Sequence, residues 1–238
     1  MLSFHSRVMS NTLLFNLLAR AEFERTDTPS STPIVVHAVA GAGKSSLLRQ
    51  LTAYYKVGTA AKPDPPSFKG DHFTACVEGI DILDEYQSAQ TIPKSASILF
   101  GDPLQDPSQA HFLRPHYLKT KSYRIGPEIA QALSQILVIQ AFGSSKLLRG
   151  SAYLDDPVGL VIAFEDQVCA ILRKHQVEHS HPSEIRGVEV DTVTLYTSTS
   201  VLPKEHHSDL YVALTRSLAK TLWLTLDAPD ARHPTADI

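Results

Sequence analysis

The chain has 238 residues, of which 43% are hydrophobic and 20% are charged. This composition excludes an intrinsically disordered protein and predicts a folded core in one large or two small domains. The formal net charge of -3 excludes a strong overall attraction to nucleic acid, so contact with RNA or DNA would depend on a local basic patch.

The cysteine content and the length of the apolar runs indicate the cellular compartment of the protein. Cys76 and Cys169 are too few for a disulfide framework and indicate a reduced, intracellular protein. We expect no secretory signal and no direct membrane span, because the longest apolar runs fall well short of the roughly 20 residues that a spanning helix needs.

The first predicted element is a helix over residues 11–25, with Asn11 or Thr12 as a suitable N-terminal cap. Its apolar residues fall on one face, namely Leu13, Leu14, Leu17, Leu18 and Ala21. We expect this face to dock on the protein core, with a membrane-surface helix as the alternative. The Ser-, Thr- and Pro-rich segment that follows predicts a linker. Residues 1–32 are therefore expected to form an N-terminal helix and linker.

A strand, a glycine-containing loop and a helix come next. Ile34 to Val36 predict a short buried strand, and residues 45–51 predict an opening helix. Between them, Gly41 and Gly43 allow the backbone to adopt positive φ angles. This order of elements brings backbone N–H groups together around an anion, where the helix N-terminus adds partial positive charge.

The loop is a candidate site for a nucleoside triphosphate such as ATP. We expect Lys44 to reach the β and γ phosphates and the Ser45 hydroxyl to bind Mg²⁺. An alanine, Ala38, stands where the full phosphate-loop pattern has a glycine, so an ordinary strand-to-helix turn is the alternative. The expected phosphate-binding residues are Ala40, Gly41, Ala42, Gly43, Lys44, Ser45 and Ser46.

Two acidic residues, Asp84 and Glu85, end the next predicted strand. Ligands of open parallel sheets bind at the carboxyl ends of the strands. We therefore expect Asp84 to hold Mg²⁺ and Glu85 to orient or deprotonate the attacking water. Asp81 is unusual for a buried central strand, and it predicts an edge strand that faces solvent there.

A further motif follows a predicted strand over residues 97–100. Residues 101–105 read Gly-Asp-Pro-Leu-Gln, and Gln105 is a candidate to hydrogen-bond the γ-phosphate or the water. An Asp-Pro turn is the alternative. The alternation of strands and helices predicts a parallel α/β sheet in a first lobe over residues 33–115.

The pattern restarts after residue 115 and predicts a second α/β lobe over residues 116–238. Pro127 can occupy the first turn of a helix that continues over residues 128–138. The other expected elements are strands at 160–164, 188–196 and 221–226 and helices at 166–175 and 208–217.

Two arginines of the second lobe are candidate arginine fingers, because phosphoryl transfer needs positive charge at the transferring group. Arg216 ends a predicted helix whose apolar face would leave the guanidinium projecting, and Arg124 follows Ser122 and Tyr123. Ordinary surface arginines are the alternative. The expected catalytic set is Lys44, Glu85, Gln105, Arg124 and Arg216.

These motifs, taken in order, resemble the motif series of superfamily 1 viral RNA helicases. The segments are AGAGKS at 40–45, LDEY at 83–86, GDPLQ at 101–105, SYR at 122–124, GVEV at 187–190 and YVALTR at 211–216. More narrowly, residues 35–45 are similar to the first triple-gene-block movement protein of flexible filamentous plant viruses. That family has alanine at the position of Ala38.

The resemblance implies an α/β fold of the P-loop NTPase class, with RecA-like parallel sheets forming a compact superfamily 1 helicase core. It implies Mg²⁺-dependent ATP hydrolysis, binding of single-stranded RNA, transport of the viral genome between cells through plasmodesmata, and suppression of host RNA silencing in the host cytoplasm. It further implies self-association and, as partners, two small membrane movement proteins, the coat protein and host silencing factors.

One segment departs from the pattern. Many helicases have a glutamine-containing stretch where residues 183–186 read Ser-Glu-Ile-Arg, so the resemblance supports hydrolysis better than unwinding. We expect RNA to cross both lobes, with Tyr123 or Phe100 stacking on bases. Two other functions stay open: a module that binds RNA or partners with incidental nucleotide turnover, and a small phosphate-loop kinase.

Overall fold

The computed structural model of the protein describes residues 4–61, 73–106 and 112–227, with the backbone alone for residues 4–11. The chain divides into two compact units, Met1–Ser122 and Tyr123–Ile238. We expected the division after residue 115. It falls later because Tyr117–Lys119 form a strand of the first sheet.

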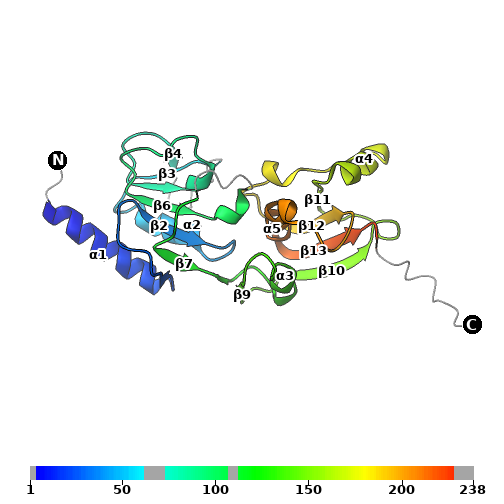
Figure 1. Ribbon diagram of the computed structural model, residues 1–238, viewed down its shortest axis with the longest axis horizontal. Coiled ribbons are helices and arrows are strands. Elements are labelled where there is room, and N and C mark those ends of the chain that lie inside the picture. Colours follow the sequence, from blue (N-terminus) through cyan, green and yellow to red (C-terminus); the bar gives the residue numbers. More distant parts are fainter. Residues whose placement is uncertain (1–3, 62–72, 107–111, 228–238) are drawn as a thin grey trace, which may run out of the picture. The chain divides into compact units, whose positions relative to one another are not determined.

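The first unit is built on a seven-stranded sheet with the strand order β1-β7-β2-β6-β5-β3-β4. Neighbouring strands are parallel except β1 and β7, which are antiparallel. The strands are β1 (Glu24–Arg25), β2 (Ile34–Ala38), β3 (Val57–Thr59), β4 (Thr74–Ala75), β5 (Ile82–Asp84), β6 (Ile98–Gly101) and β7 (Tyr117–Lys119). The predicted parallel α/β sheet is confirmed, and β2 lies inside it between β7 and β6 (Figure 1).

The inner strands are apolar because both faces of the sheet are covered. Val36, Leu83 and Leu99 are each completely buried. The edge position predicted from Asp81 is wrong, since β5 lies between β6 and β3. Asp81 precedes β5, and its carboxylate accepts a hydrogen bond of 2.9 Å from the Lys56 N–H, which explains an acidic residue next to an inner strand.

The described part of the first unit contains two α-helices, α1 (Phe4–Arg20) and α2 (Lys44–Leu51). Helix α1 starts before the predicted cap at residue 11 or 12, because neither glycine nor proline interrupts the chain ahead of it. Its predicted apolar face is confirmed, as Leu14 and Leu18 are fully buried. The Phe15 ring also stacks on Tyr117 of β7, with 5.7 Å between ring centroids. Two short 3₁₀ turns, η1 (Tyr86–Ser88) and η2 (Pro103–Gln105), follow β5 and β6.

The second unit contains a parallel four-stranded sheet with the order β10-β13-β12-β11. Its strands are β10 (Lys146–Ser151), β11 (Leu160–Ile162), β12 (Val190–Thr197) and β13 (Ser217–Thr225). The helices are α3 (Pro127–Ala132), α4 (Asp166–Lys174) and α5 (His207–Leu214), with 3₁₀ turns η3 (Pro182–Glu184) and η4 (Lys204–His206). The described residues also contain two short strands, β8 (Lys121–Ser122) at the end of the first unit and β9 (Gln140–Ala141) in the second.

The predicted helix ends need two corrections in this unit. Helix α3 stops at Ala132, six residues before the predicted end at 138. Helix α5 stops at Leu214 because β13 already begins at Ser217, where it pairs with Val190 of β12. Pro127 does occupy the first turn of α3, as predicted.

No helix among the described residues combines the length and apolar character needed to cross a bilayer.

Candidate nucleotide site

The phosphate loop lies between β2 and α2, in the middle of the first sheet. Gly41 and Gly43 have φ angles of 74° and 88°, which a residue with a side chain adopts only with strain. The Ala42 N–H donates to the Val39 carbonyl over 3.1 Å and closes the turn. Helix α2 then starts at Lys44 with Gly43 as its N-cap. The predicted strand, glycine loop and helix are therefore confirmed.

The start of α2 offers polar groups to an anion. The N–H groups of a first helical turn have no carbonyl partner within the helix, and the helix dipole adds positive charge there. Ser45 and Ser46 are exposed in this turn, and Lys44 is partly buried. The apolar side chains of the same helix, Leu47, Leu48 and Leu51, are buried and fix its orientation on the sheet.

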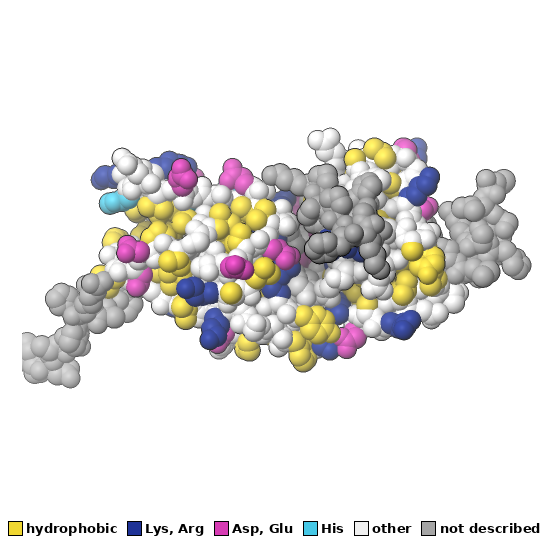
Figure 2. Space-filling model, turned by 180° about the vertical axis from the view of Figure 1, so that it is seen from behind, with side chains coloured by type: hydrophobic (Ala, Val, Ile, Leu, Met, Phe, Trp, Pro, Cys, Tyr) yellow, Lys and Arg dark blue, Asp and Glu magenta, His cyan; other side chains and the backbone are white. Residues whose placement is uncertain are grey.

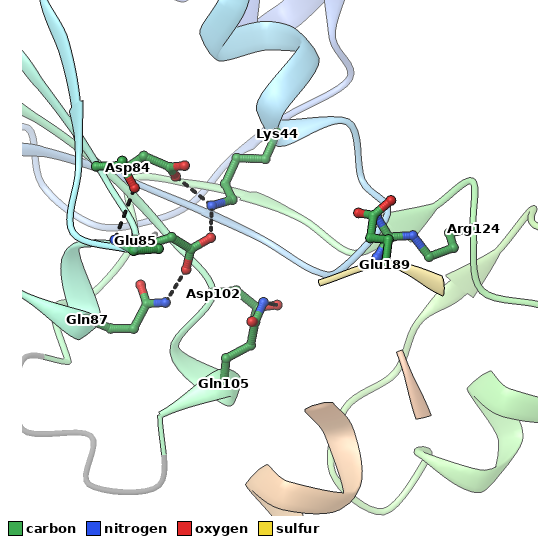
Figure 3. Close-up of polar contacts among 10 residues, drawn as sticks. Lys44, Asp84, Glu85, Gln87, Asp102, Gln105, Arg124 and Glu189 are labelled. Atoms are coloured by element: carbon green, nitrogen blue, oxygen red, sulfur yellow. Dashed lines mark hydrogen bonds and ion pairs between the residues drawn. The ribbon is translucent and has the colours of Figure 1, made fainter. Parts of the chain in front are cut away.

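The Lys44 ammonium contacts two carboxylates from the end of β5 (Figure 3). Its Nζ lies 2.5 Å from Asp84 Oδ1 and also donates to Glu85 Oε1. The side chains are largely buried, with exposed fractions of 11% for Lys44, 8% for Asp84 and 19% for Glu85. Strand order places β5 next but one to β2, so the fold brings together residues that the sequence separates by forty positions.

The backbone at Glu85 explains how two consecutive residues reach one ammonium. Successive side chains of a strand point to opposite faces of a sheet. Glu85 has a φ of 53° in the left-handed region, an uncommon conformation for a residue other than glycine. It ends the alternation directly after Asp84, the last residue of β5. Gln87 Nε2 then donates to Glu85 Oε2 and orients that carboxylate.

Burial and charge act against each other on the pKa values of this cluster. Burial raises the pKa of the Asp84 carboxyl to about 6, although the Lys44 ammonium lowers it, while the Glu85 carboxylate adds to the rise. Burial alone would lower the pKa of Lys44, but the Asp84 and Glu85 carboxylates raise it above its ordinary value. Lys44 is therefore firmly cationic at neutral pH.

Gln105 lies in η2, the turn that follows β6. Its Nε2 donates to Asp102 Oδ2 over 3.0 Å, and both side chains are buried. Gly101 at the end of β6 allows η1 to approach closely, since an added Cβ would lie 2.4 Å from Gln87 Oε1. The Asp-Pro turn offered as the alternative is therefore present. Gln105 lies in this turn, and its role at the γ-phosphate stays a prediction.

The candidate arginines gather around Thr215 in the second unit. Arg124 Nη1 donates to the Thr215 carbonyl over 3.2 Å, and Arg124 Nη2 pairs with Glu189. Arg216 Nη2 donates to Thr215 Oγ1 over 3.0 Å. The prediction that the Arg216 guanidinium projects from a helix is wrong: the residue follows α5 and is only 3% exposed.

The two aromatic candidates for base stacking differ sharply. Phe100 is fully buried inside β6, so the prediction that it stacks on bases is wrong. Tyr123 is 52% exposed, and its ring lies 6.3 Å from that of Phe142.

The sequence did not reveal Gln87 and Glu189, the partners of Glu85 and Arg124. Glu189 lies within the GVEV segment and Gln87 directly follows the LDEY segment, and that proximity was the available signal.

Comparison with protein families decides the class of the chain. Residues 34–225 match the family model of the viral superfamily 1 RNA helicase core domain. The movement and silencing protein TGBp1 of Strawberry mild yellow edge-associated virus is 38% identical, over 90% of this chain and 96% of that protein. TGBp1 of White clover mosaic virus (strain O) is 34% identical, over 92% and 98%. The chain belongs to the TGBp1 family of viral superfamily 1 RNA helicases. The predicted family and fold class are thereby confirmed.

Solved helicases provide a more distant comparison for this family. Arterivirus nonstructural protein 10 (helicase) is 16% identical, with a TM-score of 0.48 over 88% of this chain and 56% of that chain. The PRRSV helicase is 13% identical, with a TM-score of 0.47 over 91% and 51%. The chain thus spans just over half the length of these helicases.

Proposed function

We propose that the chain is an RNA-dependent ATPase of the helicase type, with its hydrolytic centre at the carboxyl ends of β2 and β5. The observation that carries the proposal is the contact of Lys44 with both Asp84 and Glu85 beside a phosphate loop. A lysine and two carboxylates so placed are the groups that phosphoryl transfer needs, and the helicase family membership supports the assignment.

The residues present fit Mg²⁺. The Ser45 hydroxyl and the Asp84 carboxylate are oxygen donors, which suit an ion that keeps several waters and takes phosphate oxygens as further ligands. Two protein ligands suffice for such a site, because waters and phosphate oxygens complete the coordination of Mg²⁺. When bound, Mg²⁺ would neutralise charge developing on the phosphates.

Each residue of the cluster then has its own role in hydrolysis. The first-turn amides of α2 bind phosphate oxygens, and the Lys44 ammonium exchanges its carboxylate partners for the triphosphate. Glu85, held by Gln87, orients the attacking water and accepts its proton. The Gln105 amide contributes a hydrogen bond to the water or the γ-phosphate. Arg124 and Arg216 supply positive charge to the transferring group as arginine fingers.

We assign the biological setting by similarity. The names of the relatives describe movement and silencing proteins, and we propose that this chain likewise supports transport of a viral genome between cells and suppresses RNA silencing. Single-stranded RNA, further copies of the chain and other viral proteins are the proposed partners, and the host cytoplasm and plasmodesmata are the proposed location. On the face drawn in Figure 2, described lysines and arginines are interspersed with acidic and hydrophobic side chains, so RNA would meet scattered cations there.

The proposal is tested by ATP hydrolysis with and without single-stranded RNA, for the native chain and Lys44→Ala, with RNA binding measured in parallel. We expect turnover that RNA stimulates and that Lys44→Ala abolishes, while RNA binding persists. Full RNA binding with no turnover by the native chain would contradict the ATPase and support a binding module instead. Strand separation, measured on a partial duplex, tests the helicase activity separately.

A further inference from the structure

The geometry points to Ser122 as a positioning residue that holds the phosphate loop in its anion-binding conformation; this inference rests on the proposed nucleotide site. Ser122 Oγ donates a hydrogen bond of 2.8 Å to the carbonyl of Ala40, the residue directly before the first loop glycine. Ser122 is fully buried, so this contact is shielded from water. Ser122 is the first residue of the SYR segment at 122–124, in which the sequence suggests roles for Tyr123 and Arg124 but none for the serine.

The physical argument starts from the peptide plane that joins Ala40 to Gly41. In a trans peptide the carbonyl and the following N–H are fixed in one plane and point in opposite directions. Holding the Ala40 carbonyl toward Ser122 therefore fixes the direction of the Gly41 N–H. A rotation of this plane by half a turn would exchange the Ala40 carbonyl and the Gly41 N–H. The carbonyl oxygen would then lie where a bound phosphate needs an N–H donor.

Such a rotation costs little conformational energy next to a glycine. Gly41 has a φ of 74°, and glycine populates positive and negative φ with similar ease. The turn that follows is closed by the hydrogen bond from Ala42 to Val39, which leaves the Ala40–Gly41 plane to be fixed by other contacts. The Ser122 hydroxyl supplies one such contact from outside the loop.

The segment that carries Ser122 is itself anchored to the first unit. The Val39 N–H donates to the Lys119 carbonyl over 3.1 Å, which extends the pairing of β2 with β7 to the start of the loop. Lys119 Nζ donates to the Ala21 carbonyl beyond the end of α1, and Lys121 pairs with Glu22. The serine thus acts from a rigid support, which a positioning role requires.

The test compares the native chain with Ser122→Ala and Ser122→Thr. The first variant removes the hydroxyl, and the second keeps it. We measure binding of a fluorescent ATP analogue with Mg²⁺, the KM and kcat for ATP, and hydrogen exchange of the 38–46 segment without nucleotide. Thr194→Val is the matched control, because Thr194 is a buried residue of the second unit whose hydroxyl donates to the Val158 carbonyl over 2.7 Å.

We expect Ser122→Ala to bind the analogue about tenfold more weakly, with the loss in KM exceeding the loss in kcat, since one buried hydrogen bond is at stake. Exchange of the 38–46 segment should accelerate, whereas Thr194→Val should leave both the affinity and that exchange as in the native chain. Recovery of affinity in Ser122→Thr supports the hydroxyl as the cause.

Unchanged affinity and exchange in a folded Ser122→Ala would overturn the positioning role and leave the nucleotide site intact. Equal losses of affinity in Ser122→Ala and Thr194→Val would also overturn it, because they would reflect general destabilisation. Absence of analogue binding by the native chain is a different outcome: it would refute the proposed nucleotide site, and this inference with it.

Discussion

Lys44 Nζ and Asp84 Oδ1 lie 2.5 Å apart, and this pair joins the first residue of α2 to the last residue of β5. Glu85 shares the same ammonium. A triphosphate has to compete with both carboxylates for Lys44, because these contacts already use two of the three N–H donors of the ammonium. Nucleotide binding and the rearrangement of the carboxylates are therefore one event in the proposed mechanism.

Replacing Glu85 separates binding from hydrolysis. Glu85→Gln keeps a side chain of the same size but removes the proton acceptor and one charge that competes for Lys44. We expect turnover to fall by at least about a hundredfold, within the range for loss of a general base. Binding of an ATP analogue should stay equal or become tighter. Steady-state hydrolysis and equilibrium fluorescence measure the two quantities.

The matched control for this substitution is Glu24→Gln, because Glu24 is an exposed glutamate of the edge strand β1. It should leave both turnover and binding unchanged. Native-like turnover in Glu85→Gln would remove Glu85 from the mechanism and point to another acceptor for the proton of the water.

Arg216→Ala should retain nucleotide binding yet lose turnover, because an arginine finger acts on charge that develops during transfer. The Arg216 side chain is buried, so the thermal unfolding of the variant must be measured in parallel to show that it is folded. Arg149→Ala is the control, as the Arg149 guanidinium lies 4.4 Å from the centre of the Trp223 ring and has no assigned role in hydrolysis. Unchanged turnover in a folded Arg216→Ala would exclude this arginine from the chemistry.

The sequence predicted those parts of the fold that depend on local pattern. The phosphate loop follows from the two glycines at their spacing, and the apolar face of α1 follows from the helical repeat of Leu14 and Leu18. The predicted first lobe ends too early in the chain because it leaves out β7. This strand, Tyr117–Lys119, is only three residues long and is positioned by its pairing with β2. Pairing between distant segments leaves little trace in local composition.

The candidate site residues show the same difference between local pattern and tertiary packing. The position of Asp84 and Glu85 beside the phosphate loop was predictable, because carboxylates at the end of an apolar strand are conspicuous. The burial of Arg216 and of Phe100 was not, since both depend on tertiary packing that helical or strand periodicity does not encode. The contact of Ser122 with Ala40 joins residues 82 positions apart and likewise required the three-dimensional structure.

His37 predicts a specific pH dependence of stability. It is buried at 6% exposure, and its Nε2 lies 2.8 Å from the hydroxyl of Tyr86, whose ring stacks on the imidazole. Burial lowers the pKa of His37 to about 4 from 6.5, and Phe112 covers it without adding charge. The unfolded chain therefore takes up a proton first as the pH falls. The contribution to stability is complete above about pH 6.5 and is lost toward pH 4, by up to about 3 kcal/mol.

Denaturant unfolding of the native chain and His37→Gln between pH 7 and pH 4 measures this contribution as the difference between the two curves. We expect the native chain to lose more unfolding free energy than the variant over that interval. The exposed His175→Gln serves as control and should follow the native curve. Parallel curves for the native chain and His37→Gln would show that the buried imidazole does not drive the dependence.

The boundary after Ser122 predicts which fragment folds. A fragment of residues 1–122 keeps β7, which pairs with β2 on one side and β1 on the other, and it keeps the bond from Lys119 to the Ala21 carbonyl. A fragment of residues 1–115 loses all of these, and β2, the strand before the phosphate loop, becomes an edge strand that pairs with β6 alone. Circular dichroism should show cooperative thermal unfolding for 1–122 and a broad, non-cooperative transition for 1–115. If 1–115 unfolded cooperatively at the same midpoint, β7 would not be an integral strand of the first unit, because the sheet would then be complete without it.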